Sequence, residues 1–450
     1  MKKLFFQMSC LSESNEIKST EIYERLFDKK VPKRYLESTV QKFLSLNKKM
    51  FSFMGIELEM SGTGSDLSIK FKTSGYIGAI PVKMPHNGIA HKDFQIIPRF
   101  DNSDHVFSDL TQLLSELEYS ISPEYADGEE LALPLQLRPP MYYEAAKYIE
   151  MFEAAQKQNW VKFEVIKRNH PSPKANTDWA KYAESSFNPV KALIYPSSDS
   201  ILSKNHKEWQ ELLYVFDIAT SIISQPNVPE SIRYKYREKI IALQKKNSSI
   251  KAIMTSAISI HSSDPHSIKE VKEQANLLLQ KGGTSCTAWR IDMAKLFERY
   301  VQHIISKSLI GIDGAVLPNN KIRGKGQIAQ WGLKYLEPDI MIKLNSSIYM
   351  ADAKYKAHYY ALGKTSEKLK ETHRADLHQL LAYCSFSPEK NKTGILLYPS
   401  NTPSCRKIDY TEQIAGVSNT VYLFGIPFGT TGITPSIDAV RQLFLDSIIF

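Results

Sequence analysis

The sequence predicts a multidomain α+β protein with a β-rich N-terminal domain, a helical middle region and a C-terminal α/β domain. First, a chain of 450 residues is too long for one ordinary hydrophobic core. Second, short β-type runs separated by turn residues occupy 67–100, whereas helical periodicity dominates 140–255. Third, helical and strand patterns alternate from about residue 268. We therefore expect domains at 1–103, 104–262 and 263–450.

Composition and charge exclude several classes of protein. Hydrophobic residues make up 42% of the chain and aromatic residues 11%, which is typical of a globular protein rather than a disordered or fibrous one. The formal net charge is +9, from 57 Lys and Arg against 48 Asp and Glu. This excess favours a polyanionic partner such as DNA, although many basic proteins bind no nucleic acid.

Membrane and secretory classes are not expected. No apolar run approaches the roughly 18 residues that span a bilayer. The N-terminal MKKLFFQMSC resembles a short signal sequence, but Gln7 interrupts its apolar stretch, so we interpret it as the start of the folded protein. The cysteines at 10, 286, 384 and 405 show neither disulfide nor zinc-site spacing. We therefore expect a protein of the reducing cytoplasm.

The first domain should contain an amphipathic segment around 35–43, followed by short strands. Strands are predicted at 67–72, 76–82 and 94–100. The second region should begin with a helix at 106–117, behind Asp104 as its N-cap. Further helices are predicted at 142–155, 209–223 and 232–245, an exposed loop at 169–182, and the main domain boundary at 262–267.

The most informative stretch is EPDIMIKLNSSIYMADAKYK at 337–356. Apolar and polar residues alternate on both sides of a turn at 345–347, which predicts a β-hairpin. If the first two turn residues form the loop, opposed positions add up to 691 (345 + 346), so that Asp339 faces Asp352. Opposed side chains share a face about 5 Å apart, and Lys354 shares it two residues further on. Two carboxylates and one ammonium group should therefore meet at one end of a sheet.

This arrangement predicts metal-dependent cleavage of phosphodiesters. Two adjacent carboxylates repel each other unless a cation lies between them, and Mg²⁺, with Mn²⁺ as a substitute, prefers oxygen ligands. Such an ion polarises a phosphate and activates water. Lys354 is expected to position that water or stabilise the transition state. A lone DxK in a strand usually only faces solvent, and the Pro-Asp pair across the turn is what favours catalysis here.

A helix predicted at 289–309 supplies a third acidic residue. Its apolar residues form a broad face with helical spacing, and Glu298 lies on the flank of that face, beside Ile305. A helical Glu ordinarily faces solvent. Because a helix packed on the sheet would direct Glu298 toward the carboxylate pair, we predict that it is a metal ligand with Asp339 and Asp352.

A second helix at 374–384 and two basic segments complete the candidate site. The helix buries Leu377 and Leu381 and carries Gln379 and Tyr383 on a separate polar stripe, where they could support the site. Basic residues in 319–332 and 356–374 are candidate phosphate contacts, although a hydrated surface explains such charges equally well. The candidates are Lys321, Arg323, Lys325, Lys356 and Arg374.

Taken together, LFE at 296–298, PD at 338–339, DAKYK at 352–356 and DLHQLLAY at 376–383 resemble the PD-(D/E)xK nuclease superfamily. More narrowly, they look like McrC, the nuclease subunit of McrBC-type modification-dependent restriction systems. The resemblance covers roughly 290–400. It implies a restriction-endonuclease-like C-terminal domain, metal ligation by Glu298, Asp339 and Asp352, a catalytic Lys354, and a supporting helix with Gln379 and Tyr383.

The resemblance also implies a partner, because McrC-like proteins dock onto an AAA+ GTPase, McrB. The chain offers no nucleotide-binding motif that would replace one. Gly363-Lys364-Thr365 resembles the end of a phosphate-binding loop, but position 358, where the first glycine belongs, is His358. We therefore expect an NTP-driven step to come from a McrB-like GTPase or ATPase subunit.

Two other readings remain open at this stage. The chain could be a non-catalytic DNA-binding adaptor that docks on and activates an NTPase, although Asp339, Asp352 and Lys354 are all present. It could also be a repair or transposon nuclease with the same fold. The sequence predicts neither the modified base nor the cleavage pattern.

Overall fold

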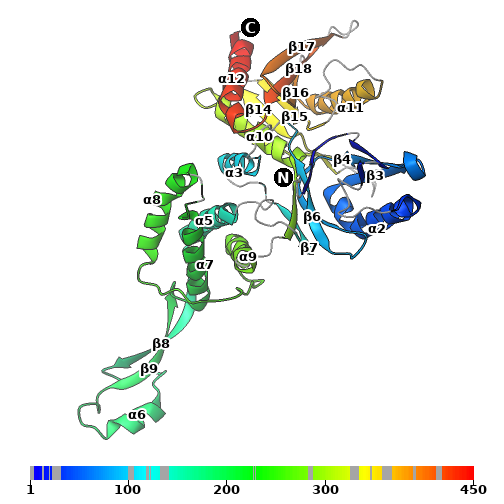
Figure 1. Cartoon of the computed structure of the whole chain (residues 1–450). Coiled ribbons are helices and arrows are strands. Elements are labelled where there is room, and N and C mark those ends of the chain that lie inside the picture. The colour runs from blue at the N-terminus through cyan, green and yellow to red at the C-terminus, as the bar shows by residue number, and fades with distance from the viewer. Residues whose placement is uncertain are drawn as a thin grey trace. The chain divides into compact units, whose positions relative to one another are not determined.

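The computed structural model forms two compact units (Figure 1). By packing, the first unit is Met1–Pro139 with Ser285–Phe450, and the second is Pro140–Thr284. The three functional domains expected from the sequence stay a prediction, because these units reflect packing alone. The structure describes residues 5–12, 15–19, 21–22, 32–99, 106–117, 121, 123–131, 141–226, 228, 230–281, 287–324, 334–344, 347–356, 367–388, 392–411 and 418–449.

The N-terminal part of the first unit contains two sheets. Its elements are β1 (Phe5–Ser9), β2 (Asn15–Lys18), α2 (Leu36–Met54), β3 (Ile56–Ser61), β4 (Ser68–Thr73), β5 (Tyr76–Lys83), β6 (Ala90–Ile97), α3 (Val106–Glu116), β7 (Glu124–Glu130) and β10 (Thr287–Asp292). The larger sheet has the order β1-β6-β5-β10-β7, and the smaller has the order β2-β4-β3. Helix α2 packs on β5. The strands predicted at 67–72 and 76–82 and the helix predicted at 106–117 are confirmed. The strand predicted at 94–100 is confirmed in part, because β6 begins at Ala90 and ends at Ile97. Asp104 lies outside the described residues.

Strand β10 corrects one prediction. The sequence WRID at 289–292 was expected to open a helix, but it pairs with β5 and β7 in the N-terminal sheet. Gly78 of β5 makes this pairing possible, because its φ is +146° and an added Cβ would lie 2.1 Å from the carbonyl oxygen of Trp289. The long-range pairing therefore overrides the local helical pattern, and the helix begins only at Met293.

The C-terminal part of the first unit is a six-stranded sheet with helices on both faces. Its elements are α10 (Met293–Ser308), β11 (Gly314–Pro318), β14 (Ile340–Leu344), β15 (Ser347–Ala353), α11 (Glu367–Cys384), β16 (Lys392–Ser400), β17 (Ser404–Thr411), β18 (Ser418–Pro427) and α12 (Ile433–Ile449). The strand order is β11-β14-β15-β16-β18-β17. Met350 of β15 packs with Leu380 of α11, whereas the neighbouring Tyr349 contacts Phe444 of α12 with ring centroids 6.0 Å apart. Because alternate residues of a strand point to opposite faces, α11 and α12 cover opposite faces of this sheet.

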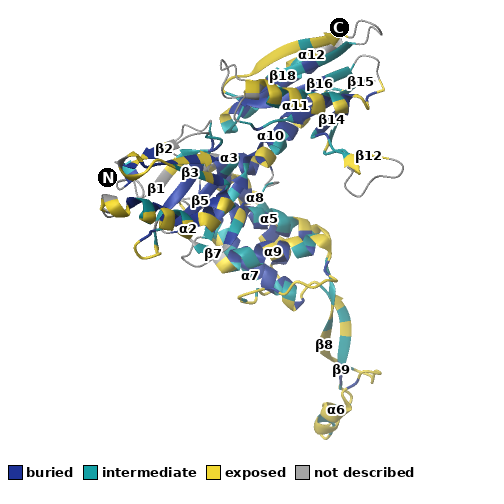
Figure 2. Cartoon of the chain, turned by 90° about the vertical axis from the view of Figure 1, so that its right-hand side faces the viewer, coloured by how far each residue is buried: buried dark blue, intermediate teal, exposed yellow. Residues whose placement is uncertain are grey.

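A short two-stranded ribbon lies in the connection between β11 and β14. Strands β12 (Ile322–Arg323) and β13 (Tyr335–Leu336) form this two-stranded ribbon. It leaves the sheet after Pro318 and returns before Ile340, two residues that pair with each other as the last pair of β11 and β14. Figure 2 shows the ribbon standing away from the sheet. The chain between the two residues therefore begins and ends at one point, beside Asp339.

The second unit is a helical bundle that carries a β-hairpin. The helices are α5 (Met141–Lys157), α7 (Lys207–Ile223), α8 (Glu230–Asn247) and α9 (His266–Lys281). Phe152 of α5 lies at the centre, with its ring centroid 5.0 Å from those of Trp209 and Phe216 of α7. The helices predicted within 142–155, 209–223 and 232–245 are confirmed.

The second unit contains a hairpin that was not predicted. Within the loop predicted at 169–182, residues 171–178 lie outside the helices and strands and are mostly exposed, as expected, whereas 169–170 end a strand and 179–182 begin a helix. Strand β8 (Lys162–His170) pairs over its whole length with β9 (Tyr195–Ser203), and α6 (Trp179–Ser186) lies between them. We call residues 162–203 the arm. Figure 2 shows that the arm is largely exposed, including its apolar side chains, with Phe187 90%, Val190 83% and Phe163 76% exposed.

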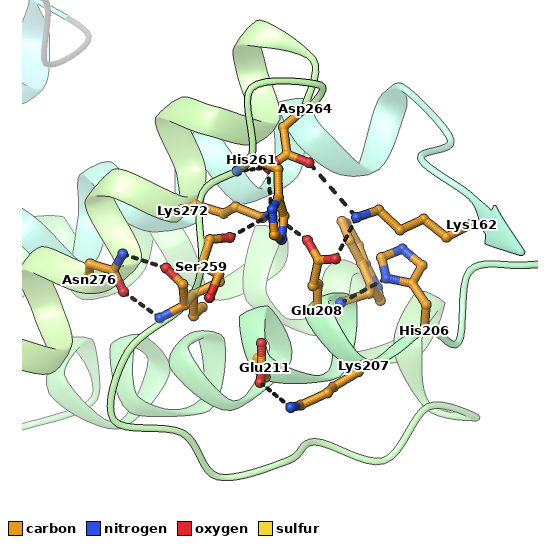
Figure 3. A network of polar contacts seen from close by, with 12 residues as sticks. Lys162, His206, Lys207, Glu208, Glu211, Ser259, His261, Asp264, Lys272 and Asn276 are labelled. Atoms are coloured by element: carbon orange, nitrogen blue, oxygen red, sulfur yellow. Dashed lines mark hydrogen bonds and ion pairs between the residues drawn. The ribbon is translucent and has the colours of Figure 1, made fainter. Parts of the chain in front are cut away.

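A buried ionic network joins the base of the arm to the bundle (Figure 3). The Lys272 side chain is 0% exposed and contacts the carboxylates of Glu208 and Asp264. Lys162, the first residue of β8, binds the same two carboxylates, at 2.5 Å from Glu208 and 3.8 Å from Asp264. Burial would raise the pKa of Asp264 and Glu208, but the two lysines outweigh it and lower both pKa values. The network therefore has two positive and two negative charges, and we call it the balanced network.

Two further observations concern sequence-based expectations. Within the described ranges, no helix is long and apolar enough to cross a membrane. Of the cysteines that the structure describes, Cys10 and Cys384 are buried and Cys405 is exposed, and all three are free thiols. Cys286 lies outside the described residues.

Candidate active site

The β14–β15 hairpin brings Asp339 and Asp352 together in the predicted register. The observed pairs run from Ile340 with Ala351 to Leu344 with Ser347, and each pair adds up to 691. Asp339 directly precedes β14, and its Oδ2 accepts a hydrogen bond from the backbone N–H of Ala353 at 2.7 Å. The predicted register is therefore confirmed, and the two carboxylates lie on neighbouring strands.

Lys354 lies at the end of β15 and is held on both sides. Its backbone N–H donates to the carbonyl of Leu397 in β16 at 2.8 Å. Its Nζ is 2.6 Å from Oδ2 of Asp352 and donates to Oε1 of Gln379 at 3.0 Å. Gln379 in turn donates to the hydroxyl of Tyr383 at 2.8 Å. Both predicted supporting residues lie on α11: Gln379 contacts Lys354 directly, and Tyr383 contacts Gln379.

Glu298 reaches the same region from α10. Asp292 caps this helix by accepting from the backbone N–H of Ala294 at 2.9 Å. The apolar face of α10 is buried as predicted, including Phe297 and Ile305. The charge of Glu298 contributes to raising the pKa of Asp339, so the helix presents this residue near the carboxylate pair.

Two residues that sequence reasoning missed hold Glu298 in place. Oε1 of Glu298 accepts from Asn319 Nδ2 at 2.8 Å and from Gln302 Nε2 at 3.1 Å. Gln302 lies four residues after Glu298, a spacing that makes helical side chains neighbours, so the sequence held a signal for it. Asn319 lies at the end of β11 with φ +49°, and no spacing in the sequence points to it.

Burial and repulsion act together on the acidic residues. Burial, then the charge of Asp352, raises the pKa of Asp339 to about 8. Burial would lower the pKa of Lys354, but Asp352 and Asp339 outweigh it and raise that pKa. Three carboxylates therefore face one ammonium group, and the region lacks positive charge.

The chemistry of this region suits a divalent cation with oxygen ligands. Asp339, Asp352 and Glu298 offer carboxylate oxygens, which Mg²⁺ and Mn²⁺ prefer. In the described part of the chain, no three His, Cys, Asp or Glu side chains already lie close enough to form a complete metal site. Asp339 and Asp352 lie next to each other on neighbouring strands, and Glu298 is held nearby by hydrogen bonds from two side-chain amides.

The predicted phosphate contacts have different surroundings. Lys321 lies over the ring of Tyr335, 4.6 Å from its centroid, while Arg323 and Arg374 are exposed. Lys356 forms an ion pair with buried Asp376 and so fixes α11 to the end of β15. Lys325 lies outside the described residues. Binding of DNA by these residues stays a prediction.

A family model matches the part of the chain that contains this site. Residues 270–399 match the family described as McrBC 5-methylcytosine restriction system component. This segment is McrBC-like. The match spans the predicted ligands Glu298, Asp339 and Asp352 and also Lys354, so the resemblance inferred from the sequence is confirmed at the level of the family.

Two solved structures are also similar to the chain. One is a refined half-complex from a tetradecameric assembly of Thermococcus gammatolerans McrB AAA+ hexamers with bound McrC. It shares 14% identity, covers 98% of this chain and 100% of that one, and has a TM-score of 0.47. The other is a cryo-EM structure of the Thermococcus gammatolerans McrBC complex, with 14% identity, 83% and 99% coverage and a TM-score of 0.29. Similarity at this level adds nothing about the chemistry of the McrBC-like segment. No curated protein matches the chain.

Proposed function

We propose that this protein is a Mg²⁺-dependent endodeoxyribonuclease with a PD-(D/E)xK, restriction-endonuclease-like domain, acting as the nuclease subunit of an McrBC-like restriction system. The observation that carries the proposal is the convergence of Asp339, Asp352 and Lys354 at one end of a sheet. The family match over 270–399 supports the restriction system.

Each residue of the site has a distinct task in this proposal. Asp339, Asp352 and Glu298 would hold the cation, which when bound supplies Lewis-acid activation of water and of the scissile phosphate. Because the pKa of Lys354 is raised, its ammonium group stays protonated at neutral pH. Lys354 therefore stabilises negative charge on the phosphate rather than removing a proton from water. Gln379 orients Lys354 through the 3.0 Å hydrogen bond.

Plasmid cleavage tests the proposal. Supercoiled DNA with and without 5-methylcytosine is incubated with the full chain in Mg²⁺ or EDTA, with and without an McrB-like AAA+ subunit. We expect cutting that requires Mg²⁺ and disappears in Asp352→Ala and Lys354→Ala. Undiminished cutting by both variants, or cutting in EDTA, would show that the proposal is wrong.

An NTPase partner is part of the same proposal. Residues 270–399 match a restriction system component, and the McrC in the similar Thermococcus gammatolerans assembly is bound to McrB AAA+ hexamers; both support a partner of this kind. We infer that an AAA+ subunit binds this chain too, and that the arm provides a surface for it. Exposed apolar side chains are typical of interaction surfaces, and the arm carries several of them: Phe163 on β8, and Phe187 and Val190 directly after α6.

The adaptor alternative makes a different prediction about metal. An adaptor needs no cation at Asp339, so titration with Mn²⁺ would give the same curve for the wild type and for Asp339→Ala. A nuclease of the proposed type loses a binding site in that variant. The measurement therefore separates the two without any DNA or partner.

A further inference from the structure

Asn319 and Gln302 lie between Glu298 and Asp339 and contact both. Nδ2 of Asn319 donates to Oε1 of Glu298 at 2.8 Å, and its backbone N–H donates to the carbonyl of Asp339 at 3.0 Å. Nε2 of Gln302 donates to the same Glu298 oxygen at 3.1 Å and to the same Asp339 carbonyl at 3.1 Å. These two residues thus connect Glu298 on α10 to Asp339, which directly precedes β14.

The orientation of both amides is fixed by their other contacts. Oε1 of Gln302 accepts from Nη1 of Arg299 at 2.8 Å, so its NH₂ group must be the part that faces the acidic residues. Oδ1 of Asn319 accepts from Gln302 Nε2 at 2.9 Å, which leaves its own NH₂ for Glu298. Gln302 is 6% exposed, so little water competes for these hydrogen bonds.

The backbone of Asn319 adds a second constraint. Its φ of +49° is in the left-handed region, which Asn adopts more readily than most residues other than Gly. It follows Pro318, the residue that pairs with Ile340 where β11 ends and β14 begins. This conformation turns the chain toward the ribbon and directs the backbone N–H at Asp339.

We propose that Asn319 and Gln302 are positioning residues for the third metal ligand. They keep Glu298 beside Asp339 and occupy its Oε1, which assigns Oε2 as the oxygen that meets the ion. Neutral amides suit this task because they fix a carboxylate without cancelling the charge that attracts a cation, as a lysine would. Hydrogen bonds of this kind orient metal ligands and commonly change metal affinity by about 10–100-fold. The inference rests on the proposed nuclease function.

The variants separate the amide of Asn319 from its backbone conformation. Asn319→Gly keeps the left-handed backbone and removes the amide, whereas Asn319→Ala removes both. Gln302→Met preserves the volume of the buried side chain and removes the donor. Asn320→Ala is the matched control, because this adjacent amide contacts Met341 Sδ at 3.7 Å instead of a carboxylate.

Mn²⁺ affinity of the full chain is measured by calorimetry without DNA, together with the melting temperature in EDTA. We expect Asn319→Gly, Asn319→Ala and Gln302→Met each to weaken Mn²⁺ binding about 10–100-fold, and Asn320→Ala to change it less than about 2-fold. In cleavage assays the Mg²⁺ concentration for half-maximal rate should rise by the same factor, with the rate at saturating Mg²⁺ within a few-fold of wild type. The melting temperature should fall more in Asn319→Ala than in Asn319→Gly.

Three results would overturn the inference, and they have different meanings. If Asn319→Gly binds Mn²⁺ as the wild type does while Asn319→Ala does not, only the backbone conformation matters and the amide has no role in positioning. If the wild type has no Mn²⁺ site that depends on Asp339, the proposed nuclease function fails together with this inference. An Asp339-dependent site that is unchanged in both Asn319→Gly and Gln302→Met refutes the inference alone.

Discussion

The balanced network and the candidate active site are both partly buried clusters of acidic and basic side chains, yet their charges are arranged in opposite ways. In the balanced network, Lys272 and Lys162 bind Glu208 and Asp264 and lower the pKa of both carboxyl groups. At the active site a single lysine faces three carboxylates, and the pKa of Asp339 rises to about 8.

This difference shows how a structural cluster can be told from a functional one. A buried cluster whose charges cancel needs no further ion. The balanced network is of this kind, and it holds the base of the arm to the bundle. A buried cluster with excess negative charge is destabilising unless something else supplies positive charge. The excess of negative charge around Asp339 therefore supports the proposed cation site.

The largest effect is expected from breaking the balanced network. Asp264→Asn leaves Lys272, whose side chain is 0% exposed, with one carboxylate fewer, and loss of one partner of a buried pair costs about 3–5 kcal/mol. Chemical denaturation should therefore show a lower free energy of unfolding. Removing the whole pair, with Lys272→Met and Asp264→Leu together, should restore much of the loss. If the double variant is less stable than Asp264→Asn, the charge-balance argument is wrong.

At the candidate active site, substitution should affect the cleavage rate directly. Lys354→Ala removes the cation that stabilises charge on the phosphate, and such losses reduce kcat by about 10²–10³-fold. The melting temperature should fall as well, because the Asp352 side chain is 1% exposed and loses its 2.6 Å ion pair with Lys354, so the rates are compared well below that temperature. Lys343→Ala is the control, because Lys343 is an exposed lysine on the same hairpin. Equal rates for the two variants would contradict the proposed role of Lys354.

The two clusters should respond to pH with opposite signs. Asp339 has a raised pKa, so the stability it contributes is full below about pH 4 and is lost as pH rises toward about 8. Glu208 and Asp264 have lowered pKa values, so their contribution is present above about pH 4 and is lost in acid.

Thermal unfolding in EDTA measures the difference. Asp339→Asn should become more stable than the wild type as pH rises from 5.5 to 8.5, by a few degrees, since each kcal/mol shifts the midpoint by about 2–4 °C. Mn²⁺ at pH 8 should remove the difference by stabilising only the wild type. A constant gap at every pH would argue against the raised pKa of Asp339.

The smallest expected effect concerns the arm. Phe187→Ser and Val190→Ser shorten exposed apolar side chains without touching either charged cluster. Each should weaken binding of the McrB-like AAA+ subunit by about 10-fold, near the 1–2 kcal/mol of a contact residue, with no change in Mn²⁺ affinity. Pull-down and Mn²⁺ titration of the same variants check both statements. Unchanged partner binding in the double variant would exclude this surface.

The sequence predicted the core of the site because local patterns determine it. Alternation and a short turn were sufficient to place Asp339 against Asp352, and the apolar face of a helix was sufficient to direct Glu298. Asn319 was missed because its conformation depends on where β11 stops pairing with β14, which is a property of the folded sheet.

Two errors in the fold have similar physical causes. WRID at 289–292 was assigned to a helix because the short segment fits both patterns, and only pairing with β5 and β7 decides between them. Strands β8 and β9, which flank the loop predicted at 169–182, were missed because β8 has no buried residue. Its apolar residues Phe163 and Val165 are exposed, so β8 does not match the pattern of a strand with one buried apolar face.

The direct connection between β10 and α10 has a mechanical consequence. Strand β10 ends at Asp292 inside the N-terminal sheet and α10 begins at Met293, whose N–H donates to the carbonyl of Gly75 at 2.9 Å. No flexible residue separates them. A twist of the N-terminal sheet would therefore move α10, the helix that carries Glu298. Such a movement would change the distance between Glu298 and Asp339.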